Sequence, residues 1–294
     1  MRWKKVTLIG VGLLGGSLGL ALRKRRLAGS VFGFVRRAAS VKECQKLGVV
    51  DRATRDLERA VVGADLIVLC TPIAQMRYLL AQMLPFVQPG AMVTDVGSVK
   101  GRVARELEPL VARAGGHFVG SHPMAGAEKM GVAAARADLF VNALCVITPT
   151  RKSNRAAVAK VERLWRAVGC RLLRLTPERH DQLVSRSSHL PHVTAATLAS
   201  LVLDPASPRE QTALCANGFR DTTRIASGSP EMWRDIALAN RRNLCGAVRA
   251  FVTDLRRFQH LLERGNGDAL SRFFERSKKL RDGWAENVGA FSTE

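Results

Sequence analysis

A glycine-rich turn near the amino terminus constrains the fold of this chain more than any other feature. An apolar run at residues 6–9 leads into the sequence Gly10-Val11-Gly12-Leu13-Leu14-Gly15, and a helical pattern follows at 14–25. In a strand–turn–helix unit of this kind, the first glycine permits a tight turn, the second lets a pyrophosphate approach the backbone, and the third lets helix and strand pack closely. The amino end of the helix then offers unpaired N–H groups to phosphate. The motif therefore predicts a dinucleotide site at Gly10, Gly12, Leu13, Leu14 and Gly15, the alternative being an ordinary glycine-rich turn.

The arrangement of apolar runs along the chain predicts two domains. Strands are expected at 6–9, 31–35, 64–70, 91–95, 117–120, 143–148 and 170–175, with helices at 14–25, 75–86, 100–114 and 152–168. This alternation favours a parallel sheet with right-handed crossovers. Beyond Pro177, long helical patterns dominate, at 178–202, 231–262 and 268–285. We therefore expect an α/β Rossmann-like dinucleotide-binding domain at 1–175, followed by an all-α domain at 176–294.

The residues after the second expected strand bear on the choice of cofactor. An NAD site usually carries an acidic residue there to bind the ribose hydroxyls, but this chain has Arg36 and Arg37 instead. Because a guanidinium group matches phosphate geometry, the pair favours NADP over NAD. The alternative is that both arginines are solvated loop residues. Thr71 and Pro72 end the third strand, and we expect them to border the cofactor as well.

Polar segments at the ends of later strands are the candidates for chemistry. Ser98 follows the strand at 91–95 and can cap the next helix or orient a catalytic group. His122 follows the strand at 117–120 and can act as a general base near neutral pH, although a lone loop histidine is as often structural. His189 and His192 share a helix face, and a three-histidine metal site with His122 is the less favoured interpretation, so no metal is expected. Arg224 lies in a polar segment typical of an anion site.

The composition bears on partners and compartment. The net charge of +21 is typical of nucleic-acid-binding proteins, but the basic residues are scattered and only 5% of residues are aromatic, so no nucleic acid is expected. The six cysteines form no C-x-x-C pair, which favours reduced thiols and the cytoplasm. The apolar segment at 6–22 contains five glycines, which disfavours a signal peptide or a membrane helix.

Several of these segments, taken in order, resemble the prephenate/arogenate dehydrogenase family of tyrosine biosynthesis. The matching pieces are Gly10–Ser17, Asp95–Lys100, His122–Glu128, His180-Asp181, Ser188–His192, Gly218–Ala226 and Met232–Asn240. The resemblance implies a Rossmann-like domain followed by a helical domain that forms a homodimer. It also implies oxidative decarboxylation of prephenate to 4-hydroxyphenylpyruvate, or of arogenate to tyrosine, with hydride transfer to NADP or NAD.

The same resemblance implies a role for individual residues. His122 is expected to take the proton from the ring hydroxyl of the substrate, and Ser98 to orient that centre. His192 and Arg224 are expected to hold the substrate, Arg224 through a carboxylate, with the remaining substrate-binding residues being Glu128 and Trp233. Two alternatives stay open: another NADP-dependent β-hydroxyacid or imine dehydrogenase, and a non-catalytic NADP-sensing or nucleic-acid-binding protein.

Overall fold

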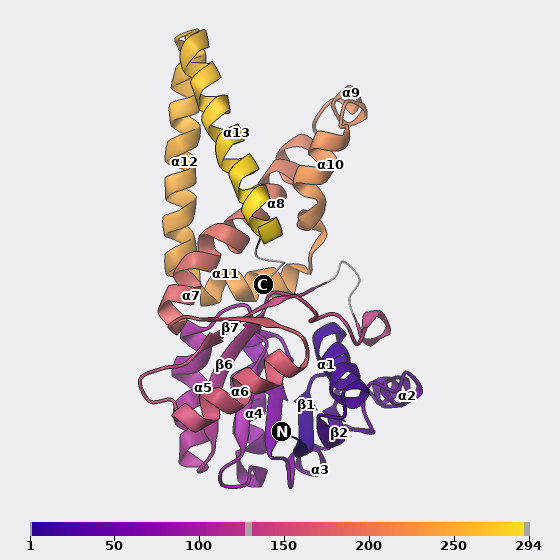
Figure 1. The fold of residues 1–294 in the computed structure, drawn as a ribbon. Helices are drawn as coiled ribbons and strands as arrows, with labels where there is room; N and C mark the ends of the chain where they lie inside the picture. The colour runs from indigo at the N-terminus through magenta and orange to yellow at the C-terminus, as the bar shows by residue number, and fades with distance from the viewer. Residues whose placement is uncertain (1, 127–130, 291–294) are drawn as a thin grey trace. The chain divides into compact units, whose positions relative to one another are not determined.

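A single eight-stranded sheet organises the amino-terminal part of the chain (Figure 1). The computed structural model describes residues 2–126 and 131–290. The strand order is β3-β2-β1-β4-β5-β6-β7-β8. The strands are β1 (Trp3–Ile9), β2 (Ala28–Phe34), β3 (Arg52–Thr54), β4 (Leu66–Leu69), β5 (Met92–Asp95), β6 (His117–Pro123), β7 (Leu144–Thr148) and β8 (Arg171–Arg174). Strands β1 to β6 pair in parallel, which confirms the expected Rossmann-like arrangement.

The far edge of the sheet differs from the expected all-parallel pattern. β7 runs antiparallel to β6, and β8 pairs in parallel with β7. A parallel neighbour needs a long crossover, usually through an α-helix. The described residues of the connection from β6 to β7 contain only a short 3₁₀ helix, η2 (Val132–Ala134), so the chain returns alongside β6 in the opposite direction.

Helices cover both faces of the sheet, which places every central strand in the core. Along β4, Leu66 and Val68 pack into one apolar cluster, and Ile67 and Leu69 pack into the other. Such two-sided burial explains why this strand is a continuous apolar run. The first cluster contains side chains of α1 (Leu13–Lys24), α2 (Ala38–Lys46) and α6 (Arg155–Ala167), and the second those of α3 (Leu57–Val61), α4 (Ile73–Met83) and α5 (Gly101–Arg113).

A helical segment with an irregular first part follows β8. Its elements are α7 (Pro177–Val184), a π-helical turn η3 (Ser185–His189), α8 (Leu190–Val202), α9 (Arg209–Ala213), α10 (Asn217–Thr223), the 3₁₀ helix η4 (Arg224–Ser227) and α11 (Pro230–Ala239). The sequence predicts one continuous helix at 178–202, whereas the π-turn interrupts it. Pro191 supplies a physical reason, because proline in a helix lacks the N–H group and crowds the carbonyl four residues earlier.

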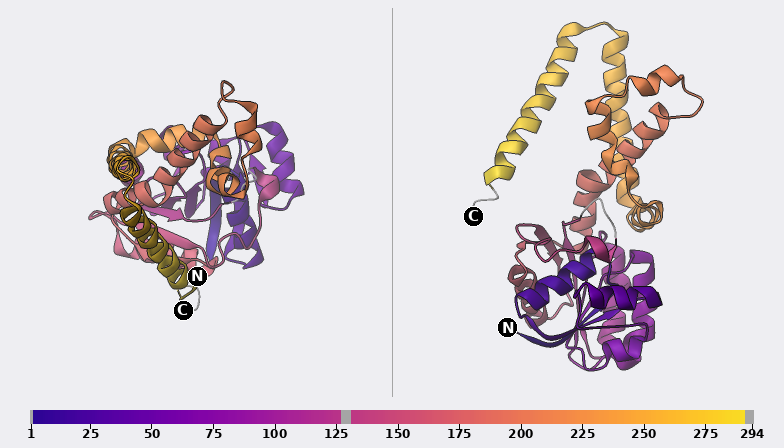
Figure 2. Two further views of the ribbon diagram at one scale, coloured as in Figure 1. Left: turned by 90° about the horizontal axis from the view of Figure 1, so that it is seen from above. Right: turned by 90° about the vertical axis from the view of Figure 1, so that its right-hand side faces the viewer.

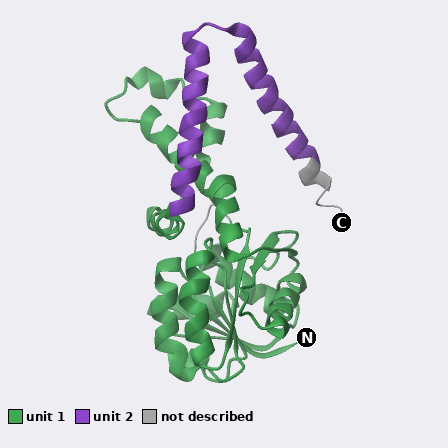
Figure 3. Cartoon of the chain, turned by 90° about the vertical axis from the view of Figure 1, so that its left-hand side faces the viewer, with its two compact units in different colours: residues 1–241 green, residues 242–294 purple. Residues whose placement is uncertain are grey.

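Compactness divides the chain into two units, residues 1–241 and 242–294 (Figure 3). The second unit contains most of α12 (Arg241–Glu263) together with α13 (Gly267–Ala290), two long helices joined by a short turn (Figure 2). Phe258 of α12 packs against Phe273 and Phe274 of α13.

A break at Asn240 separates α11 from α12, where one helix was predicted. The domain boundary expected at residue 176 stays a prediction. No helix among the described residues is long and apolar enough to span a membrane.

Candidate active site

The glycine-rich turn joins β1 to α1 at the carboxyl edge of the sheet. Gly10 has a φ of +98°, and a Cβ there would lie 2.9 Å from Cγ2 of Thr71. A Cβ at Gly15 would overlap the backbone oxygen of Gly10, so helix and turn pack too closely for any side chain. A Cβ at Gly12, by contrast, would meet no atom within 4 Å. Leu13 and Leu14 begin α1, where backbone N–H groups have no partner within the helix. The open space at Gly12 beside this helix start fits a bound pyrophosphate.

The neighbouring strand ends supply the other predicted cofactor residues. The backbone N–H of Gly10 donates to the carbonyl of Phe34 at 3.0 Å, which holds the end of β2 beside the turn. Arg36 and Arg37 follow directly and are exposed. Thr71 lies at the end of β4, and its buried hydroxyl has no hydrogen-bond partner among the described residues. Pro72 caps α4. All of these residues follow the carboxyl ends of β1, β2 and β4, the edge at which open α/β sheets bind ligands.

A buried lysine organises the end of β5. The side chain of Lys100 is fully buried, and its Nζ pairs with Oδ2 of Asp95. The same ammonium group donates to the carbonyl of Ser121 in β6 at 2.7 Å. The Asp95 carboxylate also accepts from the backbone N–H of Gly97 at 2.9 Å. A buried charge requires such pairing, so this cluster ties the ends of β5 and β6 together and fixes a positive charge beneath the site.

His122 lies at the end of β6 and contacts a second histidine. Its Nδ1 is 2.8 Å from Nε2 of His180 on α7, and Nδ1 of His180 is 2.8 Å from Oδ1 of Asp181. Burial, followed by the electrostatic effects of His180 and Lys100, holds the pKa of His122 well below its ordinary value of 6.5. Burial also lowers the pKa of His180, against the opposing effect of Asp181. Both imidazoles are therefore neutral at physiological pH.

The π-turn brings a third histidine to the same place. Asn240 donates to Nδ1 of His189 at 3.2 Å and to the backbone oxygen of Asp181 at 2.8 Å. Burial lowers the pKa of His189 to about 4, while the backbone of Ser98 acts in the opposite direction. Among the described residues, Nε2 of His189 is buried without a hydrogen-bond partner. Because Asn240 donates to Nδ1, the proton of the neutral ring lies on Nε2, the nitrogen that can donate toward the backbone of Ser98.

An aromatic pair continues the site along α8. The rings of His192 and Trp233 are stacked, with centroids 3.6 Å apart and planes inclined by 29°. Trp233 also contacts the ring of His189 edge-on at 6.1 Å. Nδ1 of His192 donates to the carbonyl of Ser188 at 3.0 Å, which leaves Nε2 of the neutral ring as an acceptor. Arg224 is exposed and begins η4, which packs against α8.

The structure thus gathers most of the residues that the sequence singled out. His122, His192 and Trp233 belong to one connected set of side chains, and Ser98 adjoins it. Glu128 lies outside the described residues. Sequence reasoning gave no role to four buried members of this set, which are Lys100, His180, Asp181 and Asn240. For two of them a signal existed, since the capped helix start at Thr176-Pro177 places His180 and Asp181 in its first turns.

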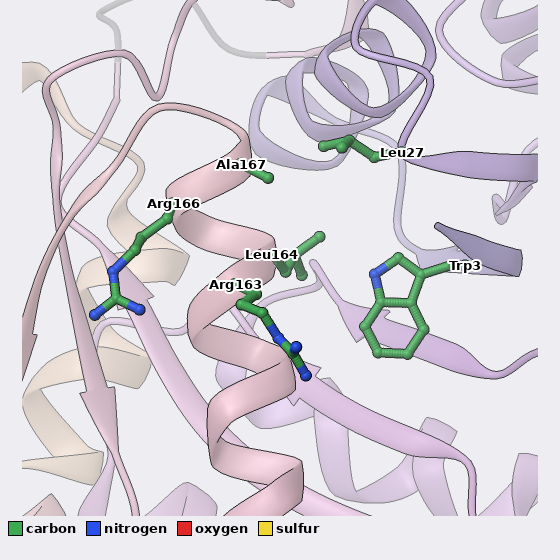
Figure 4. Close-up of a pocket in the computed structure, with 6 residues that line it drawn as sticks. All are labelled: Trp3, Leu27, Arg163, Leu164, Arg166 and Ala167. Atoms are coloured by element: carbon green, nitrogen blue, oxygen red, sulfur yellow. The ribbon is translucent and has the colours of Figure 1, made fainter. Parts of the chain in front are cut away.

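One shallow pocket lies elsewhere, with a volume of about 380 Å³ (Figure 4). Trp3 begins β1, so the pocket adjoins the amino ends of the strands rather than the carboxyl ends where open α/β sheets bind ligands. Its lining holds no histidine, acid or nucleophile and consists of Trp3, Leu27, Arg163, Leu164, Arg166 and Ala167. Within the described part of the chain, no group of three or more histidine, cysteine or acidic residues is placed to hold a metal ion.

Comparisons with known proteins agree with this architecture. Residues 18–174 match the family described as prephenate dehydrogenase, nucleotide-binding domain, and residues 176–276 match prephenate dehydrogenase, dimerization domain. A prephenate dehydrogenase of Bacillus subtilis is 34% identical over 284 residues, covering 95% of this chain and 75% of that protein.

Two solved structures share the fold at similar identity. The prephenate dehydrogenase of A. aeolicus, in complex with hydroxyphenyl propionate and NAD+, is 31% identical with a TM-score of 0.90, over 96% of this chain and 99% of that one. The arogenate dehydrogenase of Synechocystis is 31% identical with a TM-score of 0.81, over 95% and 99% of the two chains.

Proposed function

This chain belongs to the prephenate dehydrogenase family, and we propose that it oxidatively decarboxylates prephenate or arogenate with NADP+ as the preferred hydride acceptor. The observation that carries the proposal is the position of His122. A neutral, buried histidine stands at the end of β6, on the same sheet edge as the glycine-rich turn. A base at that place can reach a substrate that lies against the nicotinamide end of a dinucleotide.

The reaction needs one base and accurate positioning. His122 accepts the proton of the ring hydroxyl at C4 as the C–H bond at C4 breaks. NAD(P)+, when bound, supplies the acceptor for the hydride that leaves C4. The resulting dienone loses its ring carboxylate as CO2, and the electrons of that C–C bond complete the aromatic ring. The phenolate oxygen formed at C4 then takes a proton back, from the protonated His122 or from water. No Lewis acid is required, because the base and the gain in aromaticity drive the step.

The helical segment binds the substrate in this proposal. Both substrates carry two carboxylates, and a guanidinium group binds a carboxylate strongly through paired hydrogen bonds. We assign that contact to Arg224, which is exposed at the start of η4 beside α8. The stacked rings of His192 and Trp233 line one side of the proposed substrate site. Ser98 orients the reacting centre from the end of β5. Glu128 completes the proposed substrate contacts.

The preference for NADP+ depends on Arg36 and Arg37. Both are exposed directly after β2, and no acidic residue stands there to bind ribose hydroxyls. The side chain of Arg55 donates to the backbone oxygen of Arg36 at 3.1 Å, which steadies this loop and adds a third positive charge. Three arginines close to the end of β2 would favour a 2′-phosphate on the ribose.

A steady-state assay with both substrates and both cofactors tests the proposal. We expect reduced cofactor to form only with a cyclohexadienyl substrate, and kcat/KM for NADP+ to exceed that for NAD+ at least about tenfold. Replacing Arg36 and Arg37 together by alanine should lower kcat/KM for NADP+ about 10- to 100-fold and leave NAD+ nearly unaffected. Arg155→Ala, an exposed arginine of α6, is the matched control. A preference of the unaltered protein for NAD+, or equal losses with both cofactors, would contradict the assignment.

We also propose that the chain forms a homodimer through its second unit. Large apolar side chains stay exposed there, namely Val252, Leu255, Leu262, Phe273, Phe274, Leu280 and Trp284. Large apolar side chains left exposed on two successive helices are typical of an interface between subunits. Light scattering should give twice the mass of one chain, and a monomer at micromolar concentration would contradict this proposal.

A further inference from the structure

Two buried hydrogen bonds connect His122 to a helix start through His180 and Asp181. All three side chains are less than 10% exposed. Oδ1 of Asp181 accepts from the backbone N–H of Lys100 at 2.7 Å, and Oδ2 accepts from that of Gly101 at 2.8 Å. Both carboxylate oxygens therefore bind the amino end of α5, where the helix dipole favours negative charge. The series of hydrogen bonds that leads to His122 therefore begins at the Asp181 carboxylate, which the helix start holds in place.

The residue at position 101 makes this anchoring possible. A Cβ on Gly101 would lie 2.9 Å from Oδ2 of Asp181, so only glycine lets the carboxylate approach the backbone this closely. Asn240 holds the other side, because it donates to the backbone oxygen of Asp181 at 2.8 Å. The histidine at the far end is also fixed, since His122 pairs with Val146 across β6 and β7. Asp181 at one end of this series of hydrogen bonds and His122 at the other are thus both held in place by the surrounding backbone.

The direction of each hydrogen bond follows from the anion. The Asp181 carboxylate already accepts two N–H groups and can only accept from Nδ1 of His180. A neutral His180 with its proton on Nδ1 has an unprotonated Nε2, which must accept from Nδ1 of His122. A neutral His122 with its proton on Nδ1 then has a free electron pair on Nε2.

We propose that Asp181 and His180 are positioning residues that hold His122 in the tautomer with Nδ1 protonated and Nε2 free to accept a proton. The opposite tautomer would carry the proton on Nε2, and a base in that form cannot take up the proton of the substrate. This inference rests on the proposed function for its catalytic meaning. The tautomer itself is a property of the protein alone and can be measured without substrate.

We expect a large fall in kcat when the tautomer of His122 is no longer fixed. In serine proteases, replacing the aspartate that orients the catalytic histidine by asparagine stabilises the wrong tautomer and lowers kcat about 10⁴-fold. Here two side chains stand between the helix start and the reactive nitrogen. We therefore expect His180→Phe to lower kcat at least about 100-fold with little change in KM, since general-base catalysis contributes about 10²- to 10⁴-fold.

Nitrogen NMR on the full-length protein, labelled with ¹⁵N-histidine and free of substrate, measures the tautomer directly. The chain has six histidines, so single substitutions assign every signal. Above pH 6.5, we expect a protonated Nδ1 and an unprotonated Nε2 for His122, and the same for His180. A protonated Nε2 on His122, or an even mixture of tautomers, would overturn the proposal whatever the activity of the protein.

Three variants separate positioning from simple loss of structure. His180→Gln keeps an oxygen acceptor for Nδ1 of His122, and we expect it to retain the wild-type tautomer and kcat within about tenfold. His180→Phe removes the acceptor and should lose both. His117→Phe, at the opposite end of β6, controls for the loss of a histidine from the sheet. Equal kcat for the glutamine and phenylalanine variants would overturn the proposal. The expected tautomer without prephenate or arogenate oxidation would instead contradict only the proposed function.

Discussion

Replacing either of two glycines in the same turn by alanine should impair a different property of the protein. A methyl group at Gly15 would overlap the backbone oxygen of Gly10, and neither group can rotate away. Overpacking in a core costs about 1–3 kcal/mol. The clashing atom here belongs to the backbone and cannot rotate away, so we take the upper end of that range, about 3 kcal/mol. At about 2–4 °C for each kcal/mol, Gly15→Ala should lower Tm by roughly 6–12 °C.

Gly12→Ala should leave the fold intact and weaken the cofactor instead. The backbone of Gly12 has a negative φ of −97°, and its Cβ would meet no protein atom within 4 Å. We therefore expect the free energy of unfolding to change by less than about 1 kcal/mol. The same methyl group would fill the space proposed for the pyrophosphate, so the Kd for NADP+ should rise at least about tenfold, or 1.4 kcal/mol.

Urea unfolding and a fluorescence titration with cofactor measure both quantities on both variants. The contrast between the variants is the test, since a general defect would weaken stability and binding together. Equal losses of stability at the two positions, or normal cofactor affinity for Gly12→Ala, would refute the placement of the pyrophosphate at this turn.

Three further predictions concern the histidines and the arginine of the site. His122→Asn should lower kcat about 10²- to 10⁴-fold without changing the Kd for cofactor, and near-normal turnover would exclude His122 as the base. Arg224→Ala should raise the KM for substrate about 10- to 100-fold, as the loss of a charged hydrogen bond of about 1.5–3 kcal/mol implies, and an unchanged KM would remove its role. The pKa of His189 in the folded state is lowered from 6.5 to about 4. Between these two values of pH, His189 is protonated in the unfolded chain and neutral in the folded chain. The free energy of unfolding should therefore fall as pH decreases through this window, and His189→Gln should reduce that slope; an unaltered slope would contradict the burial of a neutral ring.

Local patterns were enough to predict the strands and helices that carry the cofactor turn. Glycine spacing, apolar runs and the change of texture after Pro177 identified a Rossmann-like domain followed by helices, because each of these signals acts within a few residues. The shortest elements, such as β3 and α9, escaped prediction because they carry too few apolar residues to show a period. The longer α2 escaped as well, and Cys44 is its only buried residue. The β-hydroxyacid dehydrogenase and non-catalytic alternatives find no support in the family matches.

The sequence by itself determined which kinds of chemistry were present: a dinucleotide turn, a histidine at a strand end, and a polar segment around Arg224. Only the tertiary structure decided which side chains share protons. His122 and His180 are 58 positions apart, and the carboxylate of Asp181 reaches the start of α5 some 80 positions away. Hydrogen bonds across such separations depend on how the sheet, α5 and α7 pack against one another. That packing determines which nitrogen of His122 is free, because a tautomer is set by its neighbours in space rather than in sequence.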